Sequence, residues 1–276
     1  MNLPHPATGA HATKKRFGQH FLHDRNILRR IVEAVSPRAG DRIVEIGPGE
    51  GALTFPLLQA AGKLTTIELD RDLIEPLRAR AAGVGELEIV HRDVLSVDFG
   101  ALAEGGVLRL VGNLPYNIST PILFHCLDHA AVIEDMHFML QKEVVDRMAA
   151  GPGSKTYGRL SVMLQLRCSV EPLFGVPPGA FRPPPKVDSA VVRLVPFTQV
   201  QLREAGVSVA AFDTIERVVR AAFGQRRKTL SNALSTVADA GQIAAAGIDP
   251  RARAEQLAPG EFVALARHLD ANSGTA

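Results

Sequence analysis

An amide, a constrained turn and an aromatic ring follow one another in Asn113-Leu114-Pro115-Tyr116, at the end of the apolar run 107–111. The amide oxygen of an asparagine accepts hydrogen bonds from an exocyclic amine, and a tyrosine ring stacks on a planar base. Because a proline follows Leu114, the backbone there is extended and the Leu114 carbonyl is free to accept a second hydrogen bond. These groups could hold a nucleobase amine for chemistry. An ordinary turn after a strand can have the same four residues, so the rest of the chain has to decide between the two interpretations.

A glycine-rich turn lies in Val44-Glu45-Ile46-Gly47-Pro48-Gly49-Glu50-Gly51. Glycines such as Gly47 and Gly49 let the backbone turn sharply after a strand and approach a ligand closely. The spacing is G-x-G-x-G, which differs from the G-x-G-x-x-G pattern of dinucleotide-binding turns. Glu45 lies inside the strand, where its carboxyl group could order the turn or bind a cationic amino-acid group.

Acidic side chains follow the next two strand-like runs. Glu68 ends the run 63–68, about 20 residues after the turn, where a carboxylate can accept hydrogen bonds from both hydroxyls of a ribose. Asp93 follows the run 87–90, in a position to accept a hydrogen bond from an adenine amine. Each acid taken singly is more often a helix cap, but together with Asn113 they mark successive strand ends, where open α/β sheets bind ligands. The set fits a ligand with a ribose and an adenine but no pyrophosphate, so S-adenosylmethionine (SAM) fits better than NAD.

Between residues 41 and 141 short apolar runs alternate with helix-like segments, as in a parallel sheet with crossover helices. We predict strands at 42–46, 63–68, 87–90, 108–111 and 136–140, and helices at 24–35, 53–61, 71–82, 120–129, 142–150 and 160–168. The runs 170–176 and 187–194 predict an antiparallel pair that closes the sheet, joined by a proline-rich loop. From about Phe197 onward the chain is alanine-rich and helical. We therefore predict a flexible tail at 1–13, an α/β domain at 14–200 and a small helical domain at 201–276.

The composition is that of a soluble globular protein. Of the 276 residues 46% are hydrophobic, and no run of about 18 apolar residues could span a membrane. The first thirteen residues lack the apolar core of a secretory signal. The two cysteines, Cys126 and Cys168, lie in apolar stretches and are predicted to be free buried thiols in a reducing cytoplasm. No Cys/His cluster has metal-ligand spacing, so no metal is expected.

The net charge of +2 says little about partners, but its distribution includes two compact basic clusters, Lys14-Lys15-Arg16 and Arg226-Arg227-Lys228. Most such triplets are solvated surface charge. The second cluster is predicted to lie at a helix start, where positive charge is unfavourable unless an anion such as RNA phosphate binds there.

With these residues in view, the chain resembles the rRNA adenine N6-dimethyltransferase family, and within it the bacterial small-subunit branch. The resemblance runs from about Lys14 to the C-terminus. It rests on the segments Phe17-Gly18-Gln19-His20-Phe21-Leu22, Glu45 to Gly51, Asn113-Leu114-Pro115-Tyr116-Asn117, Phe181-Arg182-Pro183-Pro184-Pro185-Lys186-Val187-Asp188-Ser189 and Phe223-Gly224-Gln225-Arg226-Arg227-Lys228-Thr229-Leu230. It implies an α/β, Rossmann-like class I SAM-dependent methyltransferase fold with a mostly parallel seven-stranded sheet and a small C-terminal helical domain.

The resemblance also implies roles for particular residues. SAM contacts are expected at His20, Leu22, Gly47, Glu68, Asp93 and Asn113. Family members usually have asparagine where this chain has His20, and we expect the contact to persist because histidine can also donate or accept a hydrogen bond.

In the expected mechanism the Asn113 side-chain oxygen and the Leu114 carbonyl accept the two amine hydrogens, and Tyr116 stacks on the base. Phe181, on its proline-stiffened loop, either covers the other face of the base or packs in the core. The implied substrate is a pair of adjacent adenosines, each methylated twice, in the terminal hairpin loop of small-subunit rRNA within an immature 30S particle. A monomer in the cytoplasm, without a membrane partner, is expected.

Two alternatives remain at this point. The large-subunit rRNA adenine methyltransferases that confer macrolide resistance share the fold and the N-[LI]-P-Y motif. A catalytically silent ribosome-assembly or transcription factor could use the same scaffold. The segments at 181–189 and 223–230 favour the small-subunit branch, and the intact Glu68, Asp93, Asn113 and Tyr116 argue against silence.

Overall fold

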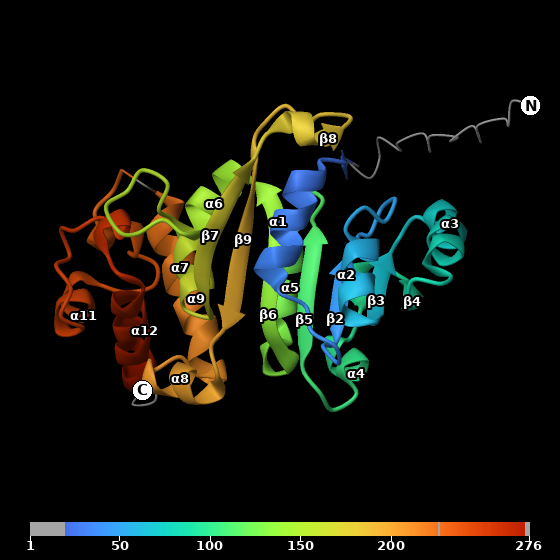
Figure 1. Cartoon of the computed structure of the whole chain (residues 1–276). Helices are drawn as coiled ribbons and strands as arrows, with labels where there is room; N and C mark the ends of the chain where they lie inside the picture. Colours follow the sequence, from blue (N-terminus) through green and yellow to red (C-terminus); the bar gives the residue numbers. More distant parts are fainter. Residues whose placement is uncertain (1–19, 226, 274–276) are drawn as a thin grey trace, which may run out of the picture.

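A seven-stranded sheet forms the centre of the protein, as the computed structural model shows (Figure 1). The structure describes residues 20–225 and 227–273; the predicted tail at 1–13, the cluster Lys14-Lys15-Arg16, the motif residues 17–19 and Arg226 lie outside them. The sheet has the order β4-β3-β2-β5-β6-β9-β7. Its strands are β2 (Ile43–Ile46), β3 (Lys63–Glu68), β4 (Glu86–His91), β5 (Leu108–Asn113), β6 (Ile133–Gln141), β7 (Cys168–Val176) and β9 (Ser189–Pro196).

The strands from β4 to β6 in this order are parallel, and β9 runs antiparallel to both β6 and β7. The predicted mostly parallel sheet and its antiparallel pair are therefore confirmed. β9 lies between β6 and β7, so the later strand of the pair is the one that joins the parallel part.

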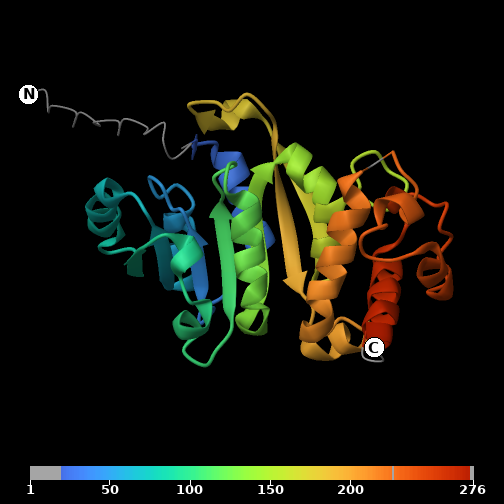
Figure 2. The same ribbon diagram turned by 180° about the vertical axis from the view of Figure 1, so that it is seen from behind.

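Helices cover both faces of the sheet (Figures 1 and 2). One face packs on α1 (Arg25–Val35), α2 (Thr54–Ala61) and the end of α3 (Arg71–Ala81). The other face packs on α4 (Phe99–Ala103), α5 (Ser119–Asp128), α6 (Lys142–Met148) and α7 (Arg159–Gln165). Asp24 caps α1 as predicted, because its side chain accepts hydrogen bonds from the N–H groups of Asn26 and Ile27.

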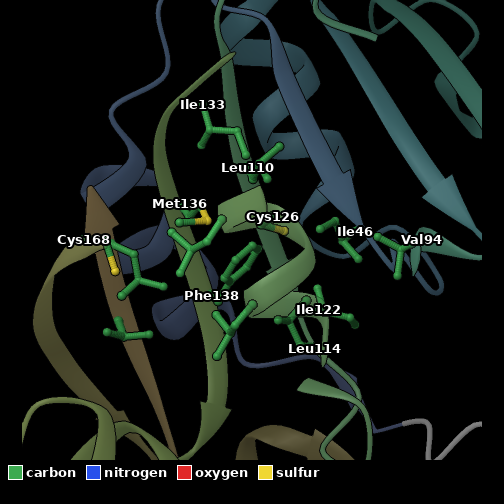
Figure 3. Packing of buried hydrophobic residues seen from close by; sticks show 14 of the residues in the cluster. Ile46, Val94, Leu110, Leu114, Ile122, Cys126, Ile133, Met136, Phe138 and Cys168 are labelled. Carbon is green, nitrogen blue, oxygen red and sulfur yellow. The ribbon is translucent and has the colours of Figure 1, made fainter. Parts of the chain in front are cut away.

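The larger core lies under α4 to α7. Figure 3 shows Leu110, Met136 and Phe138 of neighbouring strands packed with Cys126 of α5. Successive residues of a strand point to opposite faces, so Val44 enters this core while Ile43 enters the core under α1. Both cysteines are free and buried, as predicted.

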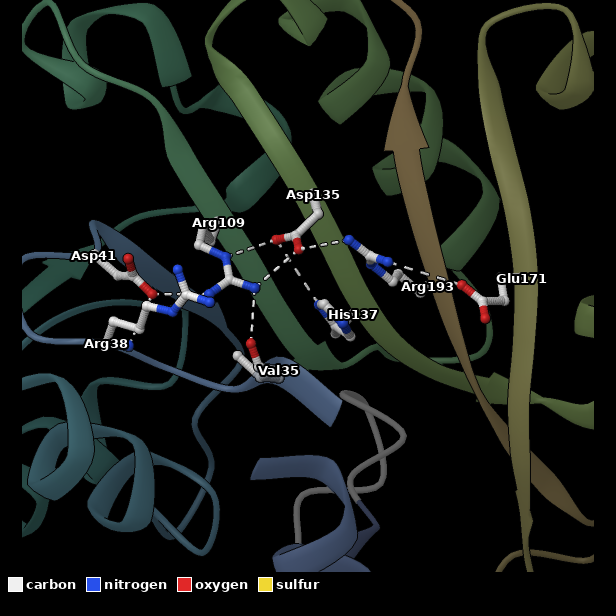
Figure 4. Close-up of polar contacts among 8 residues, drawn as sticks. All are labelled: Val35, Arg38, Asp41, Arg109, Asp135, His137, Glu171 and Arg193. Atoms are coloured by element: carbon white, nitrogen blue, oxygen red, sulfur yellow. Dashed lines mark hydrogen bonds and ion pairs between the residues drawn. The ribbon is translucent and has the colours of Figure 1, made fainter. Parts of the chain in front are cut away.

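A buried ion-pair network fastens the amino ends of the central strands (Figure 4). The guanidinium group of Arg109 donates two hydrogen bonds of 2.9 Å to Asp135 and one of 2.8 Å to Asp41. It also donates to the carbonyl oxygen of Val35 at the end of α1. The network joins β5, β6 and the loop after α1 at the end of the sheet opposite Asn113.

The C-terminal part is helical, with α8 (Gln199–Glu204), α9 (Val209–Gly224), α10 (Leu230–Ala233), α11 (Ala240–Ala245) and α12 (Pro259–Ser273). Its core also contains side chains from α7 and from the loop before it, including Val162, Met163 and Tyr157. The hydroxyl of Tyr157 donates to the carbonyl oxygen of Leu257 at 2.8 Å. The division at residue 200 stays a prediction, and the apolar core of the helical part reaches back to residue 150.

A two-stranded sheet at the carboxyl end of the main sheet was not predicted. β1 (Phe21–Leu22) pairs antiparallel with β8 (Phe181–Arg182), which lies in the proline-rich loop between β7 and β9. Short 3-10 turns occur at η2 (Val94–Ser96), η3 (Ala130–Val132), η4 (Pro178–Ala180) and η5 (Ala254–Gln256). No helix within the described residues is both long and apolar enough to cross a membrane.

Candidate active site

A cavity of about 320 Å³ opens at the carboxyl ends of the parallel strands. It brings together most of the side chains that the sequence singled out. The predicted residues that line it are His20, Leu22, Gly47, Gly49, Glu68, Asp93, Asn113, Leu114 and Tyr116. Phe181, Arg227 and Lys228 do not line it.

The glycine-rich turn after β2 has the conformation that only glycine adopts readily. The φ angles of Gly47, Gly49 and Gly51 are +70°, +55° and +83°. A Cβ atom at Gly47 would meet no atom within 4 Å, so this glycine leaves open space on the cavity side of the turn. A Cβ atom at Gly51 would lie 2.4 Å from the Phe55 ring, so that glycine is needed for packing against α2. Gly47 therefore leaves room for a close approach to the main chain.

The carboxylate of Glu68 is held at the end of β3 by main-chain N–H groups. Its oxygens accept from Asp70 at 2.7 Å and from Gly49 at 3.3 Å. Burial raises the pKa of Glu68, and these N–H groups oppose the shift. A fixed carboxylate in the cavity wall fits the expected acceptor of ribose hydroxyls.

Glu45 is buried beneath the turn. The hydroxyl of Thr54, the first residue of α2, donates to its Oε2 at 2.6 Å. Burial raises the pKa of Glu45 to about 8; the Thr54 hydrogen bond lowers it and the nearby Glu68 charge raises it. The contact to Thr54 ties β2 to α2 and supports the interpretation that Glu45 orders the turn.

Asp93 caps a short helical turn and also lines the cavity. Its Oδ1 accepts a hydrogen bond of 3.0 Å from the N–H of Leu95 and caps η2. The residue is exposed and lines the cavity, so a carboxylate oxygen remains for a ligand amine.

The amide group of Asn113 is oriented by the N-terminal segment. Its Nδ2 donates to the carbonyl oxygen of His20 at 3.0 Å, and its Oδ1 accepts no hydrogen bond from residues 20–225 or 227–273. The side chain of Leu114 is in the core, and its N–H donates to Met139 at 3.1 Å. No N–H group in the described part of the chain donates to the Leu114 carbonyl. Two carbonyl-type acceptors, adjacent along the chain, thus have no partner among the residues that the structure describes.

Tyr116 is fixed by Ser189, a residue for which no separate role was predicted. Its hydroxyl forms a hydrogen bond of 2.6 Å with Oγ of Ser189, at the start of β9. Burial raises the pKa of Tyr116, and the Ser189 contact lowers it. Tyr116 and Ser189 are 73 residues apart, so no local sequence pattern predicts their contact. The only indication in the sequence was that Ser189 ends the 181–189 motif.

Phe181 lies in the core under α1, with 2% of its surface exposed. This placement favours packing over contact with a base. The buried Phe181 side chain attaches β8, to which it belongs, to this core. Arg227 and Lys228 are exposed between α9 and α10. Because α10 has only 4 residues, its helix dipole contributes little to binding an anion. Only the positive charge of these side chains favours a contact with phosphate.

Comparison with known proteins decides the family. The family model for ribosomal RNA adenine dimethylase matches residues 10–271. The chain belongs to this family. It is an rRNA methyltransferase, and the predicted class I fold and enzyme class are confirmed.

Relatives with 66–67% identity cover 92% of this chain. Two of them are ribosomal RNA small subunit methyltransferase A of Xanthomonas oryzae pv. oryzae, at 67%, and of Xanthomonas campestris pv. campestris, at 66%; each match spans 253 residues and 95% of the relative. Among solved structures, a dimethyladenosine transferase from Plasmodium falciparum is 28% identical with a TM-score of 0.74, covering 89% of this chain and 96% of that one. The 23S rRNA methyltransferase ErmE is 29% identical with a TM-score of 0.71, covering 91% and 99%. Small- and large-subunit enzymes therefore share the fold, and the closer sequence identity is to the small-subunit methyltransferases.

Proposed function

We propose that this chain dimethylates the N6 amines of two adjacent adenosines in the terminal hairpin loop of small-subunit rRNA. The observation that carries the proposal is the pair of unpartnered acceptors at Asn113 and Leu114 beside the Tyr116 ring. The similarity to small-subunit methyltransferases favours this substrate over large-subunit rRNA. Because Glu68, Asp93, Asn113 and Tyr116 all line one cavity, a catalytically inactive assembly factor is disfavoured.

The residues around the cavity fit SAM as methyl donor. We propose that Glu68 accepts from the ribose hydroxyls, Asp93 from the adenine amine, and that Gly47 and Gly49 let the main chain approach the ligand. His20, Leu22 and Asn113 complete the wall. Bound SAM supplies an electrophilic methyl group on a sulfonium. No cluster of three or more His, Cys, Asp or Glu suited to a metal is found within the described residues.

The chain contributes orientation. An adenine amine is a poor nucleophile because its lone pair is delocalised into the ring, so its geometry has to be set before reaction. Hydrogen bonds to Asn113 Oδ1 and the Leu114 carbonyl would hold both amine hydrogens and turn the lone pair toward the donor. Stacking on Tyr116 would fix the plane of the ring. Catalysis then rests on positioning and on dipoles that are already in place.

The target adenosine has to leave its stack to reach this cavity. We propose that the substrate is rRNA within an immature 30S particle in the cytoplasm and that the enzyme acts as a monomer. We also propose that Arg226, Arg227 and Lys228 contact RNA phosphate. Such contacts would position the substrate without reading its bases.

The test is methyl incorporation from labelled SAM into small-subunit particles that lack this modification, with naked large-subunit rRNA as the competitor substrate. We expect dimethyladenosine at two adjacent small-subunit positions. Incorporation into large-subunit rRNA alone, or into neither substrate, would overturn the proposal.

Two variants separate the assigned roles. Asn113→Ala is expected to lower turnover by roughly 100-fold or more, the scale for loss of one preorganised polar contact. Glu68→Ala is expected to weaken SAM binding by about 1.5–3 kcal/mol, because hydroxyl groups lose a charged acceptor. Calorimetry with SAM and single-turnover assays measure the two effects, and a near-normal rate for Asn113→Ala rules out its assigned role.

A further inference from the structure

The imidazole ring of His20 lies on the ring of Tyr116. Their centroids are 5.8 Å apart and their planes differ by 25°. This is the geometry of an offset stacked pair. The ring that is assigned to the target base therefore already has an aromatic neighbour.

Two hydrogen bonds hold His20 in this place. Its Nδ1 pairs with the carbonyl oxygen of Pro183, in the loop after β8, at 2.8 Å. Its own carbonyl oxygen accepts from Asn113 Nδ2 at 3.0 Å. The side chain is thus fixed between the proline-rich loop and the catalytic motif, which differs from a histidine that merely faces solvent.

The residue that covers one face of Tyr116 also contacts the Asn113 amide, through its carbonyl oxygen. A base whose amine reaches Asn113 Oδ1 would stack on this face. A planar base between two rings needs roughly 3.5 Å on each side, hence about 7 Å between them. The two ring centroids are only 5.8 Å apart, so no base fits between the rings while His20 keeps this position.

We propose that the His20 imidazole holds the place of the target adenine on Tyr116, and that the base enters the site by displacing it. The inference rests on the proposed function, in which Tyr116 is the stacking platform. Displacement breaks the contact to Pro183, whereas the main-chain contact to Asn113 can persist. Since only the displaced form accepts a base, the apparent affinity for RNA is reduced by the fraction of enzyme in that form.

The first test follows the ring itself. In a carbon-detected aromatic NMR spectrum the His20 signal is the one lost in His20→Asn, and we expect it to shift in Tyr116→Leu because the neighbouring ring current is removed. Addition of a short single-stranded RNA with an unpaired adenosine, in the presence of S-adenosylhomocysteine, should move the signal toward its Tyr116→Leu position. A larger shift in the opposite direction would mean that the base is sandwiched between both rings, and no shift would mean that His20 is not displaced. Either result overturns the inference.

The second test is kinetic and compares His20→Asn with His23→Asn, a matched change at an exposed histidine of the same segment. At saturating SAM we expect His20→Asn to lower the KM for the small-subunit particle by roughly 2- to 10-fold relative to the control. An equal or higher KM contradicts the inference. SAM affinity, measured separately, reports any cofactor contact that His20 also makes. Because methylation by the wild-type enzyme tests the proposed function alone, an active enzyme whose ring is not displaced would disprove only this inference.

Discussion

The buried carboxyl group of Glu45, beneath the glycine-rich turn, makes the stability of this protein depend on pH. Glu45 is 2% exposed, and burial raises its pKa to about 8 from the ordinary value of 4.5. Between these values the folded chain keeps the proton while the unfolded chain releases it. The folded state therefore binds more protons, and its stability falls as pH rises through this window.

Glu45→Gln is expected to remove this dependence, because glutamine keeps an oxygen for the Thr54 hydroxyl and cannot ionise. We compare the free energy of unfolding of the variant with that of the wild type. This difference should increase by up to about 3 kcal/mol in favour of the variant between pH 5 and pH 7.5. Urea unfolding across this range measures it, with Glu50→Gln, an exposed acid of the same turn, as control. Burial of His137, which lowers its pKa to about 4, works in the opposite direction but is common to both proteins. A constant difference between Glu45→Gln and wild type would show that Glu45 is ionised in the fold.

The sequence could predict the position of residues that end a strand. Glu68 and Asn113 follow apolar runs, and the rules of parallel sheets place such residues at one edge. Their partners were not predictable in the same way. The contact of Asn113 with His20 joins residues 93 apart, and neither residue type demands the other.

At the scale of elements, the parallel strands were predicted because their apolar runs carry a local signal. β3 begins and ends at the predicted residues, and β2 differs by one residue. β1 and β8 have only two residues each and owe their pairing to contacts across the chain, so no periodicity could reveal them. The same pairing brings His20 to Asn113, which makes this small sheet part of the active site.

Gly112 in β5 is a position without room for a side chain. A Cβ atom there would lie 2.6 Å from the main-chain oxygen of Ile46 on β2, and main chain cannot move aside as a flexible side chain can. Gly112→Ala is expected to destabilise the protein by about 1–3 kcal/mol and to lower methyl transfer, since β5 carries Asn113. The control is Gly175→Ala in β7, where a Cβ atom meets nothing within 4 Å. Equal urea midpoints for the two variants would contradict the prediction.

At the scale of the whole molecule, the sheet and the helical part are joined through α7. Leu164 packs in the core of the sheet, while Val162 and Met163 pack in the core of the helical part. A helix shared in this way holds the two parts in a fixed relation. Cations on the helical part would then bind RNA at a fixed distance from the cavity. A fixed distance between two contact sites suits a substrate of fixed shape, such as a structured particle.

Three cations, Arg226, Arg227 and Lys228, follow α9 in the sequence. Changing Arg226, Arg227 and Lys228 together to glutamine should weaken binding to immature small subunits and leave SAM affinity unchanged. If these side chains contact phosphate, the salt dependence of binding should flatten by up to about 0.7 log units for each lost contact to single-stranded RNA. The matched control removes the same charge from Arg29, Lys63 and Arg78, exposed cations that pair with carboxylates on the sheet part. Because net charge changes equally in both proteins, a flatter slope in the first variant alone reports local phosphate contacts. Equal slopes in the two variants would mean that the cluster is solvated surface charge and that RNA is held elsewhere on the molecule.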